Sequence, residues 1–400
     1  MSGEFLLLFF GISLLLSLIM ARGATLIKTP MVVGYIVAGA ILGPAILNLI
    51  NLEQVKSLSI INTLTLSFIG FGVGGELKFS ELKKLGKAII TVVLWEATGA
   101  FVVVAVTTGL ILHNIPLGII YGALASATAP AGTTDVIKQY NAKGNLTTTL
   151  YAVMGLDDIY ALIIYTLAIP IAIIMMGGKT EGGSIAHGLE KAGLEVILSL
   201  GIGSAVGFLM AYIAAKIHDR ASILFFALGI ILLGCFVAEK LELSPILLNM
   251  AVGIVAVNYK PIIARKVFQT LGDWSPPMYV WFFVLIGTRL NFHMILTYWI
   301  LIIGYILSRT LGKWGGAFFG AKISHSPEKT VKYLGFTLLS QAGVAIGLSL
   351  AAAKSLEKLH HHAEAVQVIS VMTATTFIIM LIGPIVVKWA LIKAGEAKDI

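Results

Sequence analysis

The chain has 400 residues, of which 58% are hydrophobic and only 12% are charged. Since soluble domains carry about 25% charged residues, this composition excludes an ordinary soluble protein and indicates a chain that crosses a membrane several times. The formal net charge of +8 does not indicate nucleic-acid binding, because the basic residues lie in short loops between apolar segments. The single cysteine, Cys235, excludes an internal disulfide framework.

Hydropathy divides the chain into about thirteen apolar segments, and each is long enough to span a bilayer. We expect the first to be a retained helix, because neither a basic stretch nor a cleavage site marks it as a signal peptide. Asp273 and Pro276-Pro277 interrupt the segment 262–290. The expected fold is therefore an all-α polytopic membrane protein with spans at residues 4–20, 31–49, 57–74, 88–112, 117–138, 146–176, 187–215, 221–239, 243–258, 262–290, 294–322, 329–353 and 364–393.

The loops between these segments alternate in charge. One set of loops holds most of the lysines and arginines, for example Lys83, Lys84 and Lys87, while the opposite set holds few. The positive-inside rule makes the basic side cytoplasmic. We therefore expect a protein of the plasma or inner membrane whose N-terminus lies outside and whose C-terminus lies in the cytoplasm.

Two adjacent carboxylates, Asp157 and Asp158, lie in the middle of an apolar run. A charged side chain at the centre of a bilayer costs roughly 3 kcal/mol or more, so such residues are functional by default. The alternative is a purely structural role, in which Asp157 and Asp158 are neutral, lie in a kinked helix and form hydrogen bonds with neighbouring groups. Arg309 also lies within an apolar run and needs a buried anionic partner or water, since arginine cannot be deprotonated in practice.

A shift of 213 residues aligns the unusual positions of the two halves of the chain. The shift spans an odd number of helices, so the second copy has inverted topology, which is typical of secondary transporters. Chance similarity between apolar helices is the alternative. We expect one transmembrane domain over 1–400, with repeat one at about 1–176, a linker helix at about 187–215, repeat two at about 221–393 and a cytoplasmic tail at 394–400. The aligned positions are 74–79 with 287–292, Glu96 and Gly99 with Arg309 and Gly312, Thr128-Ala129-Pro130 with Gln341-Ala342-Gly343, and Asp157 with Ser370.

One pair of aligned positions predicts two broken helices. Pro130 lies mid-span among small and hydroxyl residues, and Gln341 and Gly343 mark a similar weak point in the second copy. Proline and glycine there would interrupt the helix and free backbone groups, which is tolerated at membrane depth only inside protein or beside a cavity. We expect the two breaks to cross at the midplane; ordinary kinks are the alternative.

The same shift of 213 residues also predicts a pair of opposite charges within the membrane. Glu96 and Arg309 occupy equivalent positions in the two copies. We expect them to form an intramembrane ion pair that supports the core, with Asp157 as the competing partner of Arg309. Lys313 follows one turn after Arg309, and we expect it to share the role of buried cation with Arg309.

These features together resemble the monovalent cation:proton antiporter superfamily, specifically its sodium/proton exchanger branch with the NhaA-like fold. The resemblance covers essentially the whole chain. It implies a homodimer in which a scaffold holds a moving core, with Asp158 as the direct Na⁺ ligand, Asp157 beside it and Thr128 lining the site. It implies no cofactor and no nucleic-acid partner. The motifs that carry it are Gly155-Leu156-Asp157-Asp158, Thr128-Ala129-Pro130, the run from Pro30 to Ile36, Gly43-Pro44, and Arg309 to Gly312 with Gly316-Ala317.

The expected function is exchange of Na⁺ (or Li⁺) for H⁺ by alternating access, without enzymatic activity. Na⁺ and H⁺ would compete for Asp158, and an arginine that keeps its proton predicts one H⁺ per Na⁺ and thus electroneutral exchange. A potassium/proton antiporter and a sodium-coupled organic-anion symporter on the same fold stay open as alternatives. A passive channel fits less well, because the few polar groups within the membrane cluster at one depth.

Overall fold

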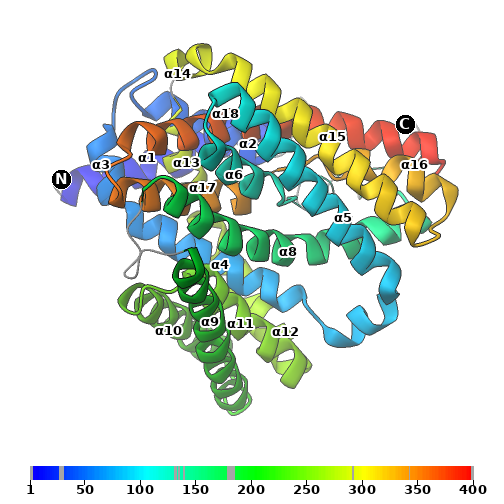
Figure 1. Cartoon of the computed structure of the whole chain (residues 1–400). Coiled ribbons are helices and arrows are strands. Elements are labelled where there is room, and N and C mark those ends of the chain that lie inside the picture. Colours follow the sequence, from blue (N-terminus) through cyan, green and yellow to red (C-terminus); the bar gives the residue numbers. More distant parts are fainter. Residues whose placement is uncertain are drawn as a thin grey trace. The chain divides into compact units, whose positions relative to one another are not determined.

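The computed structural model describes residues 3–26, 31–129, 133, 136–137, 140–177, 185–290, 292–341 and 343–397. Within these residues every regular element is a helix, which confirms the all-α prediction (Figure 1). The helices are α1 (Gly3–Leu26), α2 (Met31–Leu42), α3 (Leu52–Ser57), α4 (Ser59–Glu76), α5 (Phe79–Leu112), α6 (Ile115–Ala125), α8 (Asn145–Met175), α9 (Ile185–Ala214), α10 (Arg220–Lys240), α11 (Pro245–Tyr259), α12 (Pro261–Trp274), α13 (Pro276–Gly287), α14 (Phe292–Thr297), α15 (Trp299–Ile323), α16 (Glu328–Thr337), α17 (Gly343–Lys358) and α18 (His362–Ala394).

Six of these helices are long and apolar enough to cross a membrane, namely α1, the part of α5 from Gly86, α8, the part of α9 from Gly193, α10 and α18. Five more, in α2, α4, α6, α11 and α13, are apolar but shorter. The protein is therefore a polytopic membrane protein. The number of thirteen spans is not established by these helices, because several expected spans are divided between two elements.

The expected span 262–290 is wrong as a single helix. The chain forms α12 up to Trp274 and a separate α13 from Pro276. Prolines lack the N–H that would continue the helix, and they favour the first turn of a new one. Helix α12 is amphipathic: Ala264, Val267, Thr270 and Leu271 are buried, while Arg265, Lys266 and Asp273 are exposed.

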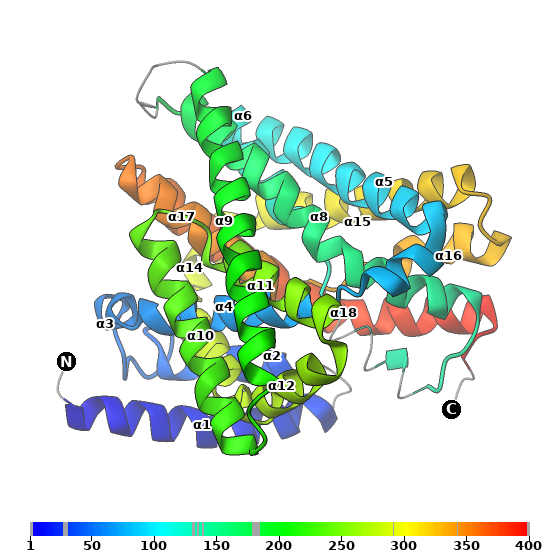
Figure 2. The ribbon, with the colours of Figure 1, turned by 90° about the horizontal axis from the view of Figure 1, so that it is seen from below.

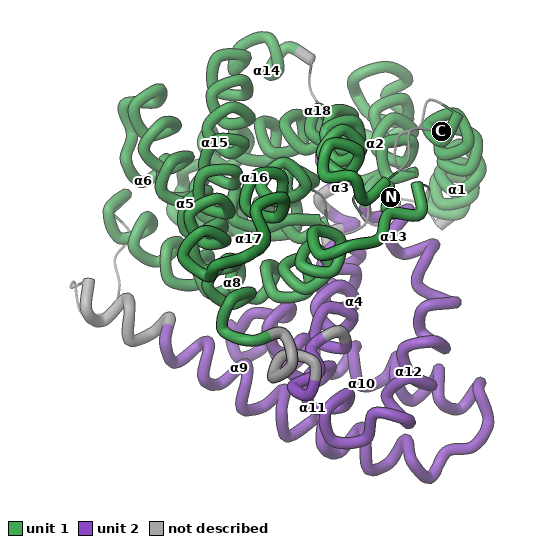
Figure 3. The backbone as a smooth tube through the Cα atoms, turned by 90° about the vertical axis from the view of Figure 1, so that its right-hand side faces the viewer, with its two compact units in different colours: residues 1–52, 85–188, 283–400 green, residues 53–84, 189–282 purple. Residues whose placement is uncertain are grey.

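The chain forms two compact units, coloured separately in Figure 3. Unit 1 comprises residues 1–52, 85–188 and 283–400, and unit 2 comprises residues 53–84 and 189–282. Each unit therefore takes helices from both halves of the sequence. The paired aspartates on α8, and every other residue predicted for the ion site, belong to unit 1.

Within unit 1, the boundaries of helices follow the offset expected from the sequence. Helix α6 begins at Ile115 and α16 begins at Glu328, 213 residues later. Residues 126–129 after α6 and residues 338–341 after α16 have no regular structure. The 213-residue offset seen in the sequence therefore also relates the starts of these two helices.

Helices α5 and α15 lie side by side through glycines (Figures 1 and 2). A Cβ at Gly99 would lie 2.7 Å from the Gly312 carbonyl oxygen, and a Cβ at Gly312 would lie 2.7 Å from the Gly99 carbonyl oxygen. Gly316 meets Trp95 and Glu96 in the same way. Residue numbers that rise on one helix therefore fall on the other, so the two helices run antiparallel and cross where the two repeat-related glycines meet.

Because no side chain fits at this crossing, we predict that Gly312→Ala destabilises the protein by about 1–3 kcal/mol, the usual cost of overpacking. Gly315 is the matched control, since a Cβ there has no heavy atom within 4 Å. Thermal unfolding of the purified protein in detergent measures both variants. Equal melting temperatures for Gly312→Ala and Gly315→Ala would contradict the close contact.

Candidate ion-binding site

Two helix breaks cross at the centre of unit 1. Helix α6 ends at Ala125 and α16 ends at Thr337, and irregular backbone follows each end. The Ala129 N–H donates to the Ser340 carbonyl at 2.9 Å, which joins the two breaks directly. The prediction of two crossing broken helices is confirmed. Pro130 lies outside the described residues.

Gln341 and Gly343 take different places at the second break. Gln341 lies in the irregular stretch and is fully buried. Its Nε2 donates to the Leu124 carbonyl at 3.1 Å and to the Tyr305 hydroxyl at 2.8 Å. Gly343 is the first residue of α17. The amide of Gln341 thus ties the second break to α6 and α15.

Arg309 on α15 is buried against the carbonyl groups of both breaks. Its Nε donates to the Ala125 carbonyl at 3.1 Å, and its two terminal nitrogens donate to Ala127 at 2.8 Å, Leu339 at 2.6 Å and Ser340 at 3.4 Å. Carbonyl ends of helices carry a partial negative charge, and arginine offers several donors in a rigid fork. One side chain therefore satisfies the freed carbonyls of both broken helices.

Lys313, one turn further along α15, forms the charged centre of the site. Its ammonium donates to the Ser126 carbonyl, to the Thr128 hydroxyl at 2.7 Å and to Asp157 Oδ2 at 3.1 Å. These contacts use the three donors of an ammonium group. Glu96 Oε2 lies 2.7 Å from the same nitrogen and is held by charge attraction. Lys313, Glu96, Thr128 and Asp157 are all fully buried.

The structure does not contain the expected ion pair between Glu96 and Arg309; Glu96 pairs with Lys313 instead. The reason is the inverted symmetry. Helices α5 and α15 are antiparallel about Gly99 and Gly312, so residues that precede these glycines lie on opposite sides of the crossing. Glu96 therefore faces the part of α15 beyond Gly312, where Lys313 lies.

Sequence reasoning assigned Lys313 only a shared role beside Arg309, whereas in the structure it is the cation that contacts Asp157 and Glu96. A usable signal was present in the sequence. Antiparallel pairing through the two aligned glycines places Glu96 level with residues 315 and 316 and not with residue 309. The lysine nearest to that level is Lys313.

The paired aspartates are buried in the middle of α8. Asp157 is completely buried and Asp158 is 3% exposed. Asp157 Oδ1 and Glu96 Oε1 are buried without a hydrogen-bond donor among the described residues. Carboxylate oxygens of this kind suit a hard monovalent cation, because such ions prefer oxygen ligands.

The sequence predicts that the carbonyl groups freed at the two breaks lie beside a cation site, but fewer of these groups are free to bind a cation than expected. The carbonyls of Ala125, Ala127, Leu339 and Ser340 already accept hydrogen bonds from Arg309, and that of Ser126 accepts one from Lys313. Among the described residues, no three His, Cys, Asp or Glu side chains gather as a metal cage. The oxygen atoms left for a cation among the predicted ion-binding residues are those of the two aspartates and the Thr128 hydroxyl.

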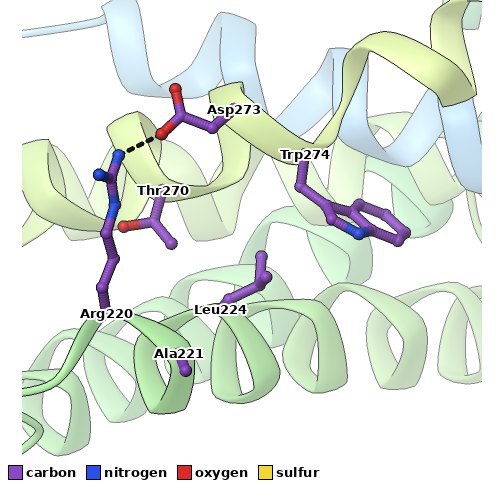
Figure 4. A pocket seen from close by; sticks show the side chains of 6 residues that line it. All are labelled: Arg220, Ala221, Leu224, Thr270, Asp273 and Trp274. Atoms are coloured by element: carbon purple, nitrogen blue, oxygen red, sulfur yellow. Dashed lines mark hydrogen bonds and ion pairs between the residues drawn. The ribbon is translucent and has the colours of Figure 1, made fainter.

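A shallow pocket of about 310 Å³ lies between α10 and α12 in unit 2 (Figure 4). Arg220 and Asp273 form an ion pair at its rim, and both side chains are exposed. Exposed ion pairs contribute little free energy and are screened by salt. The pocket contains none of the residues of the buried charge cluster.

Comparisons with known proteins show the family of the chain. The transmembrane sodium/hydrogen exchanger family matches residues 11–393. The Cation/H(+) antiporter 19 of Arabidopsis thaliana is 25% identical over 389 residues, which cover 89% of this chain and 47% of the plant protein. The chain thus spans about half the length of that relative. The Na(+)/H(+) antiporter of Enterococcus hirae is 24% identical, with 90% of this chain and 91% of that protein covered.

Solved structures show the same fold. The sodium proton antiporter MjNhaP1 of Methanocaldococcus jannaschii, at pH 8, superposes with a TM-score of 0.77. The match covers 97% of each chain at 19% sequence identity. An electron-microscopy structure of the same protein gives a TM-score of 0.75. Since the family matches nearly the whole chain, this protein belongs to the sodium/hydrogen exchanger family.

Proposed function

We propose that the protein is a secondary active antiporter that exchanges Na⁺ (or Li⁺) for H⁺ at Asp157 and Asp158. The observation that carries the proposal is the burial of two adjacent carboxylates, one of them (Asp157) paired with Lys313, at the crossing of two broken helices. Broken helices at membrane depth are the usual setting of ion sites in secondary transporters. The names of the bacterial and plant relatives, which are cation/proton antiporters, support the same reaction class.

Exchange follows from competition for one negative charge. Asp157 is already paired with Lys313, so we assign Asp158 as the carboxylate that carries Na⁺ and H⁺ in alternation. Occupancy by both would place an extra positive charge in a low dielectric, which is costly. Each conformational change would therefore move either one Na⁺ or one H⁺, and coupling requires no further component.

Charge balance supports one H⁺ per Na⁺. The buried ionisable residues assigned to the proposed site are the carboxylates Glu96, Asp157 and Asp158 and the cations Arg309 and Lys313. When all are ionised one negative charge is left over, and a single Na⁺ or a single H⁺ neutralises it. The original reason for electroneutral exchange, an arginine beside Asp157, no longer applies, since that cation is a lysine. We propose that Glu96, ionised beside Lys313, supplies the new reason: a neutral Lys313 would leave Glu96 as an uncompensated buried charge.

Three further features belong to the proposal. The basic loops support a cytoplasmic C-terminus, an external N-terminus and a place in the cell membrane. We propose a homodimer, as the resemblance to this transporter family implied. We also propose Na⁺ rather than K⁺ as the transported ion, with the K⁺/H⁺ antiporter as the alternative that ion replacement in the transport assay tests.

We predict that Asp158→Asn abolishes Na⁺-driven proton movement, because the amide cannot alternate between bound H⁺ and bound Na⁺. Purified protein in liposomes with an internal pH-sensitive dye measures this. Asp219→Asn is the matched control: Asp219 is exposed and caps α10 by accepting from the Ser222 N–H at 2.8 Å, and asparagine caps equally well. Proton movement that survives Asp158→Asn, or that Na⁺ never drives in the unmutated protein, would contradict the proposed function.

We predict that an imposed membrane potential does not change the rate of Na⁺-driven proton movement. One positive charge in each direction moves no net charge, so the potential does no work on the cycle. The same liposomes, with the potential clamped at zero or set inside-negative, provide the test. A rate that rises with the potential would mean more than one H⁺ per Na⁺ and would refute the charge balance, though not the exchange itself.

A further inference from the structure

The start of α8 lacks a capping side chain of its own. Its N-cap residue is Gly144, which makes no side-chain hydrogen bond to the first turn. The first N–H groups of a helix have no partner within the helix and need one from elsewhere. Here the partner comes from the far end of the chain: the Leu146 N–H donates to Glu396 Oε1 and the Thr147 N–H donates to Glu396 Oε2, both at 2.8 Å.

Two more contacts complete the junction. The Thr147 hydroxyl donates to Glu396 Oε2 at 2.8 Å, and the Lys143 N–H donates to the Glu396 carbonyl at 2.9 Å. A Cβ at Gly144 would lie 2.2 Å from the Glu396 carboxyl carbon. The absence of a side chain at Gly144 is therefore what admits the carboxylate.

Glu396 reaches α8 because α18 ends in a tight turn. Gly395 adopts a left-handed conformation with φ of 76°, and its N–H donates to the Ile392 carbonyl. The Glu396 N–H then bonds the Leu391 carbonyl at 3.0 Å, in the manner of a Schellman motif. The turn brings the end of α18 beside the start of α8 (Figure 2).

The other end of α8 is also tied to the start of α18. His361, the N-cap residue of α18, places Nε2 3.3 Å from the Met176 carbonyl at the end of α8 and Nδ1 3.2 Å from Glu364. Helices α8 and α18 are thus joined at both ends, although the contact at the Glu396 end has more hydrogen bonds. The Glu396 end therefore supplies the stronger of the two hydrogen-bonded restraints that α18 places on axial movement of α8.

This restraint affects the candidate ion site, because α8 carries both aspartates while Lys313, the partner of Asp157, is on α15. Lys313 is on α15 and is fixed independently by Ser126 and Thr128. A helix transmits an axial displacement along its length, and an ion pair at 3.1 Å is sensitive to such a displacement. The distance between Asp157 and Lys313 therefore depends on where the first turn of α8 is held.

We propose that Glu396 is a positioning residue of the ion site: its carboxylate caps α8 from the end of α18 and so sets the register of Asp157 and Asp158 against Lys313. The proposal depends on the proposed cation exchange at these aspartates. It makes the segment after α18 part of the transport machinery and not a passive tail. The interaction is that of an anion with the N–H groups at a helix N-terminus, and here the anion is the carboxylate of Glu396 from the same chain.

The test compares Glu396→Ala, Glu396→Gln and Thr147→Val in the full chain, with Na⁺-driven proton movement in liposomes as the readout. Glu396→Ala should raise the apparent KM for Na⁺ by about two- to fivefold, the factor that a typical helix cap represents. Glu396→Gln should have an intermediate effect, since one carboxylate oxygen is replaced by a donor. Thr147→Val removes only the hydroxyl donor and should have the smallest effect, with no further rise when it is combined with Glu396→Ala.

Glu328→Gln is the matched control, because Glu328 is an exposed glutamate in the first turn of α16 outside the ion site; its KM should not change. A purely structural role would lower the melting temperature or the maximal rate and leave the KM for Na⁺ unchanged in all Glu396 variants, and that result would overturn the proposal. If Glu396→Ala does not fold, an unchanged KM in Thr147→Val overturns it. Absence of any Na⁺-driven proton movement in the unmutated protein would instead refute the proposed function.

Discussion

The structure depends on satisfying carbonyl groups where two helices break inside the membrane. Each break frees backbone acceptors at a depth where water is scarce, and an unsatisfied group there costs several kcal/mol. Arg309 meets this requirement for both breaks at once, through four carbonyls. The guanidinium is therefore fixed in place by the backbone. Its position also sets that of Lys313, which follows one turn later on the same face of α15 and meets Asp157.

Much of the fold could be predicted from the sequence, because apolar segments and basic loops reflect the bilayer directly. The offset of the repeat and the two breaks were also visible, since they rest on Pro, Gly and small residues at fixed positions. The prediction that residues 262–290 form one span was wrong. Its average hydropathy concealed that α12 is amphipathic, with Arg265 and Lys266 on its exposed side, and that the prolines begin a new helix.

The site was predicted less completely, and the error has a geometric cause. Equal sequence offset identifies residues related by the repeat, but inverted repeats bring such residues together only at the crossing point, as at Gly99 and Gly312, and place the others on opposite sides of it. Glu96 and Arg309 are therefore equivalent without being neighbours, and Glu96 pairs with Lys313. The contact partners of Arg309 could not be predicted at all, because they are backbone carbonyls and carry no signature in the sequence. The role of Glu396 was hidden for a similar reason: it acts on main-chain N–H groups 250 residues away along the chain.

These constraints together limit what can move at the site. The carbonyls of the breaks accept hydrogen bonds from Arg309 and Lys313, so the proposed exchange would leave the carboxylates and the Thr128 hydroxyl as ligands for the cation. Lys313 is held by three hydrogen bonds and by Glu96, so it is a fixed charge. The side that can adjust is α8, whose aspartates lie between its two attachments to α18. In the proposed exchange, an ion that replaces a proton on α8 changes the attraction between α8 and the fixed charge of Lys313 on α15, and this change couples ion binding to movement of α8.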